Sequence, residues 1–256
     1  MPYSLSGRNV LITGGSRGLG AVSAEKFASE GSNVAINYMS NKETAEKLAS
    51  DIASKYGVKA IVIQGDAGIK EDCINAVETA IEKLGGLDII ISNAVGYTGK
   101  SDDLDAMDDD DWDKCWSVNV KSSFHLFKAA LPTFNANPEG GVFLITASTA
   151  IVISQGVTAI GSSLPYAVTK AASIHLMKCL AQSQGSKVRV NAILPGLLLT
   201  EWGQRFSPEK VEGWTNATTL KRVPEVEDCA DMFITLAKNA SMTGRTVQID
   251  SGFAIC

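Results

Sequence analysis

The sequence predicts an α/β fold in which a parallel sheet of seven strands is covered by helices on both faces, the arrangement called doubly wound. Two observations lead to this class. Short apolar runs alternate with longer helix-like segments from one end of the chain to the other, as in sheets built from strands and crossover helices. The chain also has 256 residues without an internal repeat or a linker, a length that one hydrophobic core supports. Residues 1–256 are therefore expected to form a single domain.

The strands are expected where apolar residues run together over a few positions, because the central strands of a parallel sheet are buried on both faces. These runs are Asn9–Thr13, Asn33–Tyr38, Ala60–Gly65, Leu87–Ser92, Gly141–Thr146, Val188–Ile193 and Val247–Ile249. Helices are expected between them, at Gly18–Glu30, Lys42–Lys55, Lys70–Leu84, Asp109 to about Phe134, Leu164–Gln182 and Glu225–Lys238. The irregular stretch Leu197–Pro224 is too long for an ordinary connection, and we interpret it as a functional lid over the substrate.

Charge and composition exclude several classes of partner. The chain has 28 acidic and 23 Lys or Arg residues, a formal net charge of −5, so it offers no general attraction to nucleic acid or anionic lipid. Met1–Arg8 does not resemble a secretory leader, and no run approaches the roughly 20 apolar residues that span a bilayer. We expect a cytoplasmic protein with no nucleic-acid or membrane partner. Its five cysteines lie far apart, which predicts free thiols.

A glycine-rich turn joins the first strand to the first helix. It places glycines at positions 14, 18 and 20, with Gly-x3-Gly-x-Gly spacing. Such glycines permit a tight turn, close approach of the backbone to a pyrophosphate and close helix packing. A phosphate loop of the ATPase kind needs Lys and then Ser or Thr after its last glycine, and this turn has neither. The pattern favours a dinucleotide site of the Rossmann type, with a plain tight turn as the alternative.

The run from Thr13 to Gly20 resembles the cofactor signature of the short-chain dehydrogenase/reductase family, and further matches follow in the family's order along essentially the whole chain. Asp66-Ala67 resembles the family's adenine contact, and Asn93-Ala94 resembles its Asn-Asn-Ala-Gly element. Pro195-Gly196, followed by Thr200, resembles the loop that receives the nicotinamide carboxamide. The chain departs from the pattern at three places. Ser92 replaces the first Asn of Asn-Asn-Ala-Gly, and Val95-Gly96 stands for its Gly. In Asp250-Ser251-Gly252, which resembles the end of the family's C-terminal strand, Ser251 replaces a common Gly.

The resemblance implies a nicotinamide dinucleotide as cofactor. The residues expected to bind it come from the glycine turn, the strand ends and the segment after the sixth strand: Gly14, Ser16, Arg17, Gly18, Leu19, Gly20, Tyr38, Ser40, Asp66, Ala67, Asn93, Ala94, Tyr166, Lys170, Pro195, Gly196, Leu198 and Thr200.

Tyr166 and Lys170 form the centre of the predicted catalytic group. A spacing of four residues places the phenol and the ammonium on one face of a helix. A free Tyr titrates near 10 and is a poor acid or base at neutral pH unless a nearby cation stabilises its phenolate, and Lys170 can supply that cation. The pair alone also fits a solvated helix face. In the family, the Lys additionally binds the nicotinamide ribose.

Ser148 closes the fifth strand and, by resemblance, polarises the substrate carbonyl beside Tyr166. It precedes Tyr166 by 18 positions, a longer spacing than is usual in the family, which indicates an insertion within Ile151–Ser163. Ser154 lies on that segment and is a rival for the role. We prefer Ser148 because the end of a strand fixes its position.

Asn119 resembles the family's Asn that interrupts its helix and holds a water linked to the Lys; a helix-surface Asn is the alternative. The acidic cluster Asp108–Asp111 precedes the same helix, where carboxylates interact favourably with exposed amides. We therefore expect these acids to cap the helix, and we expect no metal site.

The end of the second strand predicts NADPH as the cofactor in preference to NADH. An NAD-selective site offers an acid there, about 20 residues beyond the glycine turn, to bind the ribose 2′-hydroxyl. This chain has no acid in Asn37–Ser40. Arg17, in the glycine turn, can make a charge-assisted contact with a 2′-phosphate. Ser40, Asn41 and Lys42 are candidate helpers.

The reaction implied is the reversible reduction of a ketone to an alcohol, in which Ser148 holds the carbonyl oxygen and Tyr166 delivers the proton. A non-catalytic nucleotide-sensing or assembly protein, and an elimination or isomerisation that uses the cofactor, are the alternatives. The lid is rich in apolar residues, which either favour a hydrophobic, bulky substrate or pack the lid against the body: Leu197, Leu198, Leu199, Trp202, Phe206 and Trp214. By resemblance the chain is a homodimer or homotetramer that pairs through the helices at Asp109–Phe134 and Leu164–Gln182.

Overall fold

The computed structural model describes residues 3–98, 105–151, 163–201 and 203–255. Ser154, Trp202, Cys256 and most of the Ile151–Ser163 segment lie outside the described residues.

A single sheet of seven parallel strands runs through the described part of the molecule. The strands are β1 Asn9–Ile12, β2 Asn33–Tyr38, β3 Ala60–Gln64, β4 Ile89–Ser92, β5 Gly141–Thr146, β6 Val188–Pro195 and β7 Thr246–Ile249. Their order across the sheet is β3-β2-β1-β4-β5-β6-β7, and every neighbouring pair is parallel. The predicted doubly wound fold is confirmed, with strand ends within two residues of those expected.

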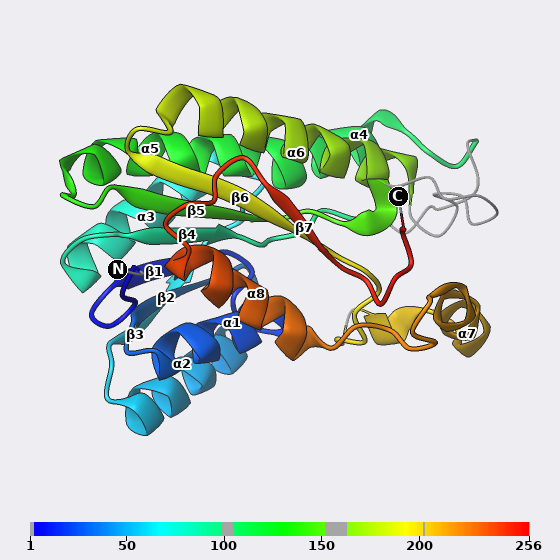
Figure 1. Cartoon of the computed structure of the whole chain (residues 1–256), viewed down its shortest axis with the longest axis horizontal. Helices are drawn as coiled ribbons and strands as arrows, with labels where there is room; N and C mark the ends of the chain where they lie inside the picture. Colours follow the sequence, from blue (N-terminus) through cyan, green and yellow to red (C-terminus); the bar gives the residue numbers. More distant parts are fainter. Residues whose placement is uncertain (1–2, 99–104, 152–162, 202, 256) are drawn as a thin grey trace.

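Helices cover both faces of the sheet (Figure 1). One layer contains α1 Gly18–Ser29, α2 Lys42–Tyr56 and α8 Val226–Lys238, and the other contains α3 Lys70–Leu84, α5 Ser122–Ala136 and α6 Leu164–Gln184, with α4 Asp109–Trp116 beside α6. Among the described residues, no helix combines the length and the apolar character that crossing a bilayer requires. The four described cysteines are free, as predicted for them.

Alternation along the strands explains why both layers form. Val10 and Ile12 pack into the core under α1, α2 and α8, whereas Leu11, between them, packs into the core on the α3, α5 and α6 side. Successive side chains of a strand point to opposite faces, so a strand covered on both sides must be apolar at every position. The same division holds in β4, where Ile89 and Ile91 face one layer and Ile90 the other.

The structure corrects two predicted segments. The single helix predicted from Asp109 to about Phe134 is α4 and α5 joined by a π-helical turn, Ser117–Lys121, where the Ser122 N–H donates to the Ser117 carbonyl five residues back. The Leu197–Pro224 stretch is not irregular throughout, because it contains a short 3-10 turn, Gly203–Arg205, and the helix α7, Pro208–Ala217.

Local chemistry accounts for α7. The Ser207 hydroxyl accepts a hydrogen bond from the Lys210 N–H at 3.3 Å, and Pro208 occupies the first turn, both common signals for the start of a helix. None of the α7 residues is buried. The helix therefore lacks the apolar periodicity that identified the other helices in the sequence.

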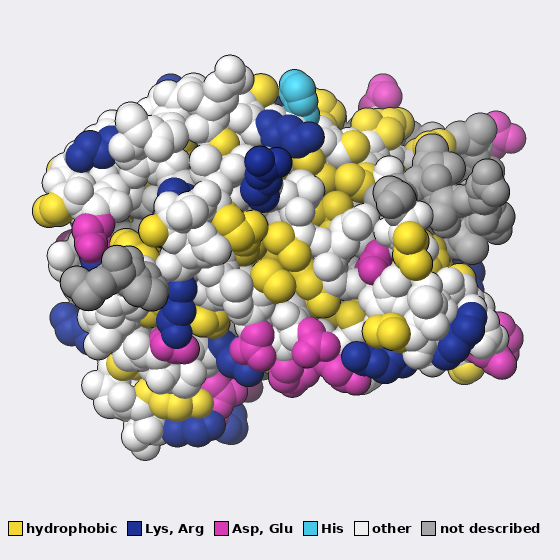
Figure 2. All heavy atoms as spheres, viewed as in Figure 1, with side chains coloured by type: hydrophobic (Ala, Val, Ile, Leu, Met, Phe, Trp, Pro, Cys, Tyr) yellow, Lys and Arg dark blue, Asp and Glu magenta, His cyan; other side chains and the backbone are white. Residues whose placement is uncertain are grey.

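Strand order positions a crevice at the carboxyl ends of β1 and β4. These strands are neighbours in the sheet, but the chain continues from β1 into α1 on one face and from β4 toward α4 on the other. At such a reversal the connections diverge and leave a ligand-binding crevice. Figure 2, in the same view as Figure 1, shows hydrophobic side chains gathered over β7 and part of α6.

Candidate active site

A cavity of about 800 Å³ lies at the carboxyl ends of the strands, within the usual range of roughly 300–1,000 Å³ for small-molecule sites. Most of the residues predicted to bind cofactor or substrate line it: Gly14, Ser16, Arg17, Gly18, Leu19, Tyr38, Ser40, Asp66, Ala67, Asn93, Ala94, Ser148, Tyr166, Pro195, Gly196, Leu198 and Thr200. Gly20, Asn119 and Lys170 are buried outside this lining. Residues far apart in the sequence therefore line one cavity.

The glycine turn has a backbone that larger residues could not adopt. Gly14 and Gly18 have φ of 60° and 53°, the left-handed region that favours glycine. A Cβ on Gly20 would lie 2.3 Å from the Gly14 carbonyl oxygen. No acidic residue stands in the first turn of α1, and no side chain caps it. The α1 amides at the cavity wall are thus open to an anion, which fits the pyrophosphate of a dinucleotide.

Asn93 and Thr13 lock this turn to the end of β4. The Asn93 amide donates to the carbonyls of Thr13 and Gly14 at 3.1 and 3.3 Å. The Thr13 hydroxyl accepts from the N–H groups of Asn93 and Ala94 at 2.9 and 3.1 Å. The Asn93 side chain therefore positions the turn, a role that its motif did not reveal.

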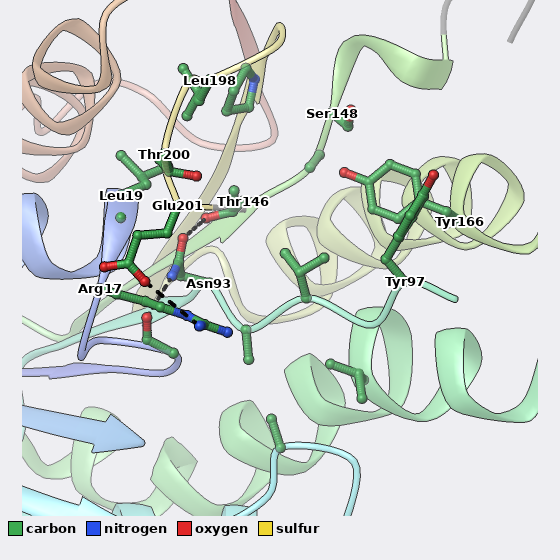
Figure 3. A pocket seen from close by; sticks show the side chains of 18 of the residues that line it. Arg17, Leu19, Asn93, Tyr97, Thr146, Ser148, Tyr166, Leu198, Thr200 and Glu201 are labelled. Atoms are coloured by element: carbon green, nitrogen blue, oxygen red, sulfur yellow. Dashed lines mark hydrogen bonds and ion pairs between the residues drawn. The ribbon is translucent and has the colours of Figure 1, made fainter. Parts of the chain in front are cut away.

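The end of the cavity predicted to bind adenosine has no acid at the β2 terminus. Asn37 donates to the carbonyls of Ile63 and Gly65 at 3.3 and 3.1 Å, which fastens β2 to β3, and Tyr38 beside it lines the cavity. Asp66, after β3, accepts a hydrogen bond from the Gly68 N–H at 2.8 Å. Arg17 reaches across the cavity mouth to Glu201, with 3.8 Å between Nη1 and Oε2 (Figure 3).

Tyr166 and Ser148 face each other in the cavity, with Tyr97 beside the Tyr166 ring (Figure 3). The Ser148 hydroxyl lies close enough to the phenol to lower the Tyr166 pKa, and the rings of Tyr97 and Tyr166 meet edge to face with centroids 5.6 Å apart. Lys170 lies behind, with Nζ 5.6 Å from the Tyr166 ring centroid and 2.6 Å from the Thr146 carbonyl oxygen to which it donates. The predicted Ser, Tyr and Lys are brought together.

Burial is the largest influence on the pKa of both Tyr166 and Lys170. It raises the pKa of Tyr166 to about 12, with the Ser148 hydroxyl acting in the opposite direction, and lowers the pKa of Lys170 from 10.5 to about 7. Desolvation penalises the charged form of each group, and for Tyr166 it outweighs the opposing influence of Ser148. At neutral pH the phenol therefore keeps the proton that it would donate to a carbonyl.

The lowered Lys170 pKa also makes the free energy of folding depend on pH. The unfolded chain holds the lysine proton up to its ordinary pKa of 10.5, whereas the folded protein releases it near 7. Between these values the unfolded state binds more protons, so this group makes folding more favourable as pH rises. Below pH 7 the folded protein carries the full cost of a buried ammonium.

Asn119 interrupts its helix, as the motif predicts, at the π-helical turn. Its side chain accepts from the Gly96 N–H at 2.9 Å and donates to the Gly96 carbonyl and the Thr169 hydroxyl, each at 3.0 Å. These bonds join the loop after β4 to α6, one residue before Lys170. Asn119 thus holds two walls of the site together.

The acidic cluster caps α4 as predicted. The Asp108 carboxylate accepts from the Asp111 N–H at 3.1 Å, and the Asp111 carboxylate accepts from the Asp108 N–H at 3.0 Å. This reciprocal pair is a capping box. Both carboxylates therefore accept hydrogen bonds from backbone N–H groups at the start of α4.

Sequence reasoning missed two aromatic residues that line the cavity, Tyr97 and Phe253. Tyr97 follows the Asn93-Ala94 element closely, so its place in the sequence was a usable signal. Of the predicted lid residues, Leu197, Leu198, Phe206 and Trp214 line the cavity, and Phe206 and Trp214 pack edge to face with ring centroids 4.9 Å apart. Leu199 does not line it and is exposed.

Comparison with known proteins agrees with this geometry. A family described as enoyl-(acyl carrier protein) reductase matches residues 14–254. The chain is 30% identical to the 3-oxoacyl-(acyl-carrier-protein) reductase FabG of Staphylococcus aureus, over 96% of this chain and 97% of that protein. The structure superimposes on the NADPH-dependent 3-quinuclidinone reductase of Rhodotorula rubra with a TM-score of 0.89 and 29% identity, covering 99% of this chain and 93% of the other. A short-chain dehydrogenase of Burkholderia cenocepacia in complex with NADP gives 0.88 and 29%, covering 99% and 100%.

Proposed function

The chain belongs to the short-chain dehydrogenase/reductase family of oxidoreductases, and on that premise we propose that it reduces a ketone of a hydrophobic small molecule to an alcohol, reversibly, with NADPH. The observation that carries the proposal is the placement of Tyr166 and Ser148. Their hydroxyls meet in the cavity, and a lysine lies behind the phenol. Two neighbouring hydroxyls, of which the phenol is protonated at neutral pH, can bind and protonate a carbonyl oxygen.

The roles of the chain's own residues follow from their contacts. A bound nicotinamide supplies the hydride. Ser148 orients the carbonyl oxygen toward Tyr166, and the Tyr166 hydroxyl delivers the proton. Lys170 then lies where its charge favours the resulting phenolate, since an opposite charge nearby lowers a phenol pKa.

Arg17 is the residue that favours NADPH. The similar 3-quinuclidinone reductase is NADPH-dependent and the similar Burkholderia dehydrogenase binds NADP, and the β2 end of this protein lacks the acid that NAD-selective sites use. The Arg17 guanidinium stands at the adenosine end of the cavity and is about half exposed. It can form a charge-assisted bond with a 2′-phosphate.

The apolar residues of the lid support the proposal that the substrate is apolar. Phe206 and Trp214 pack against each other at the cavity wall, and Leu197 lines the same wall. Tyr97 adds a further aromatic ring next to Tyr166. A ketone with a bulky apolar substituent would bury its apolar surface against these side chains.

The surfaces of helices α4, α5 and α6 support the proposal that the protein is a homo-oligomer. Their outer surfaces carry half-exposed or exposed apolar residues: Trp112, Trp116, Phe124, Leu164 and Val168. An exposed set of large apolar side chains on neighbouring helices marks an interaction surface. We infer that two copies pair through these helices, and that the exposed edge of β7 can join dimers into a tetramer.

Turnover of a ketone panel with NADPH tests the function directly. The wild type should consume NADPH with apolar cyclic or aryl ketones, and Tyr166→Phe should lower turnover by about 10² or more while NADPH affinity stays normal, because a positioned proton donor contributes about 10²–10⁴. Near-normal turnover in Tyr166→Phe would remove the phenol from the mechanism. Tight NADPH binding by the wild type without turnover of any ketone would favour a nucleotide-sensing role.

Two serine variants are the internal control for this experiment. Ser148→Ala should reduce turnover far more than Ser154→Ala, because Ser148 lines the same cavity as Tyr166 and faces its phenol (Figure 3). The opposite order of turnover numbers would assign the role to Ser154.

Cofactor titration tests Arg17. Arg17→Ala should weaken NADPH binding by about tenfold or more, the loss of one hydrogen bond to a charged group, and leave NADH binding nearly unchanged. Glu201→Gln is the matched control, since it removes the ion pair of Arg17 but keeps the cation, so NADPH binding should persist. An equal loss for both cofactors in Arg17→Ala would overturn the assignment.

Light scattering after size-exclusion chromatography tests the interface. Trp116→Glu should reduce the particle mass, because it buries a charge in an apolar contact. Lys47→Glu, on the exposed surface of α2 and on the opposite face of the sheet, should leave the mass unchanged. A wild-type monomer, or an unchanged mass for Trp116→Glu, contradicts pairing through these helices.

A further inference from the structure

The chain after β7 forms a rigid turn at the carboxyl end of the sheet. The two carboxylate oxygens of buried Asp250 accept from the N–H groups of Gly252 and Ala254, each at 3.0 Å. The backbone passes through Ser251 and Gly252 with φ of 57° and 75°. A serine in the left-handed region is uncommon, and the Asp250 bonds hold it there. The position of Phe253, the next residue, is thus fixed.

The turn is tied to the end of the lid. The N–H groups of Thr219 and Leu220 donate to the carbonyls of Gly252 and Ser251 at 3.2 and 3.0 Å, and the Thr219 hydroxyl donates to the Gly252 carbonyl at 2.9 Å. In Figure 1 the red segment after β7 accordingly extends toward the end of the molecule where α7 lies. The end of the lid and the turn after β7 therefore form one wall of the cavity.

The same turn also contacts the loop after β6. The Gly196 N–H donates to the Ile249 carbonyl at 2.9 Å, and a Cβ at Gly196 would lie 3.0 Å from the Asp250 Cα. Asp250 and Phe253 line the cavity together with Val223 and Pro224 from the lid. Ile255, two residues beyond Phe253, is 73% exposed and is not part of the lining.

We propose that Phe253 is a specificity-determining residue, which closes the lid end of the cavity and contacts the apolar part of the ketone. This inference rests on the proposed function for the identity of the substrate. It assigns the C-terminal segment of the chain to the substrate site, with an aromatic or cyclic apolar substituent as the group that Phe253 recognises. Aromatic contacts of this kind contribute beyond the area that they bury.

Kinetics and binding of the full-length protein test the proposal. With the best aryl ketone of the panel, Phe253→Ala should raise KM by about tenfold and leave kcat and the NADPH dissociation constant within about twofold. Phe253→Leu should restore most of the affinity, because it keeps an apolar side chain. The matched control Ile255→Ala should behave as the wild type.

Calorimetric titration of the same ketone into the enzyme saturated with NADP+ gives a readout without turnover. Phe253→Ala should weaken ketone binding by the same factor by which it raises KM. Unchanged ketone affinity in Phe253→Ala, or an equal loss in Ile255→Ala, overturns the inference while leaving the proposed function intact. A wild type that binds the ketone but turns over none contradicts the proposed function instead.

Discussion

Desolvation of Tyr166 and Lys170 is the constraint on which the rest of the site depends. The lysine is 2% exposed, and its Nζ donates to the carbonyl of Thr146 at the end of β5. Burial shifts the two pKa values apart, to about 12 for the phenol and about 7 for the ammonium. A phenol that resists ionisation is suited to donate a proton only if charge is supplied close by when it leaves, and Lys170 stands where it can supply that charge.

A chain of hydrogen bonds connects this buried pair with the glycine turn. Lys170 donates to the Thr146 carbonyl, and the Thr146 hydroxyl donates to the Asn93 side chain at 3.0 Å. Asn93 in turn donates to the carbonyls of Thr13 and Gly14. Lys170 and the glycine turn are thus both fixed by the ends of neighbouring strands.

The sequence was informative wherever local pattern decides structure. Buried parallel strands require continuous apolar runs, and the glycine turn requires residues without Cβ, so both could be predicted. The helix α7 was missed, because it buries no residue, although Ser207 and Pro208 are usual signals for the start of a helix. Phe253 was missed for another reason: its place in the cavity depends on the Asp250 turn and on hydrogen bonds to Thr219 and Leu220. The role of Ser154 still rests on the sequence, since that residue lies outside the described structure.

The most direct test of this account is the titration of Lys170 itself. Carbon-13 labelling of the lysine Cε, followed by NMR across the pH range and with Lys170→Met to assign the signal, reports the charge of this one group. Because burial is the largest influence on its pKa, the midpoint should lie near 7. A midpoint at the ordinary value of 10.5 would contradict the claim that desolvation governs the site.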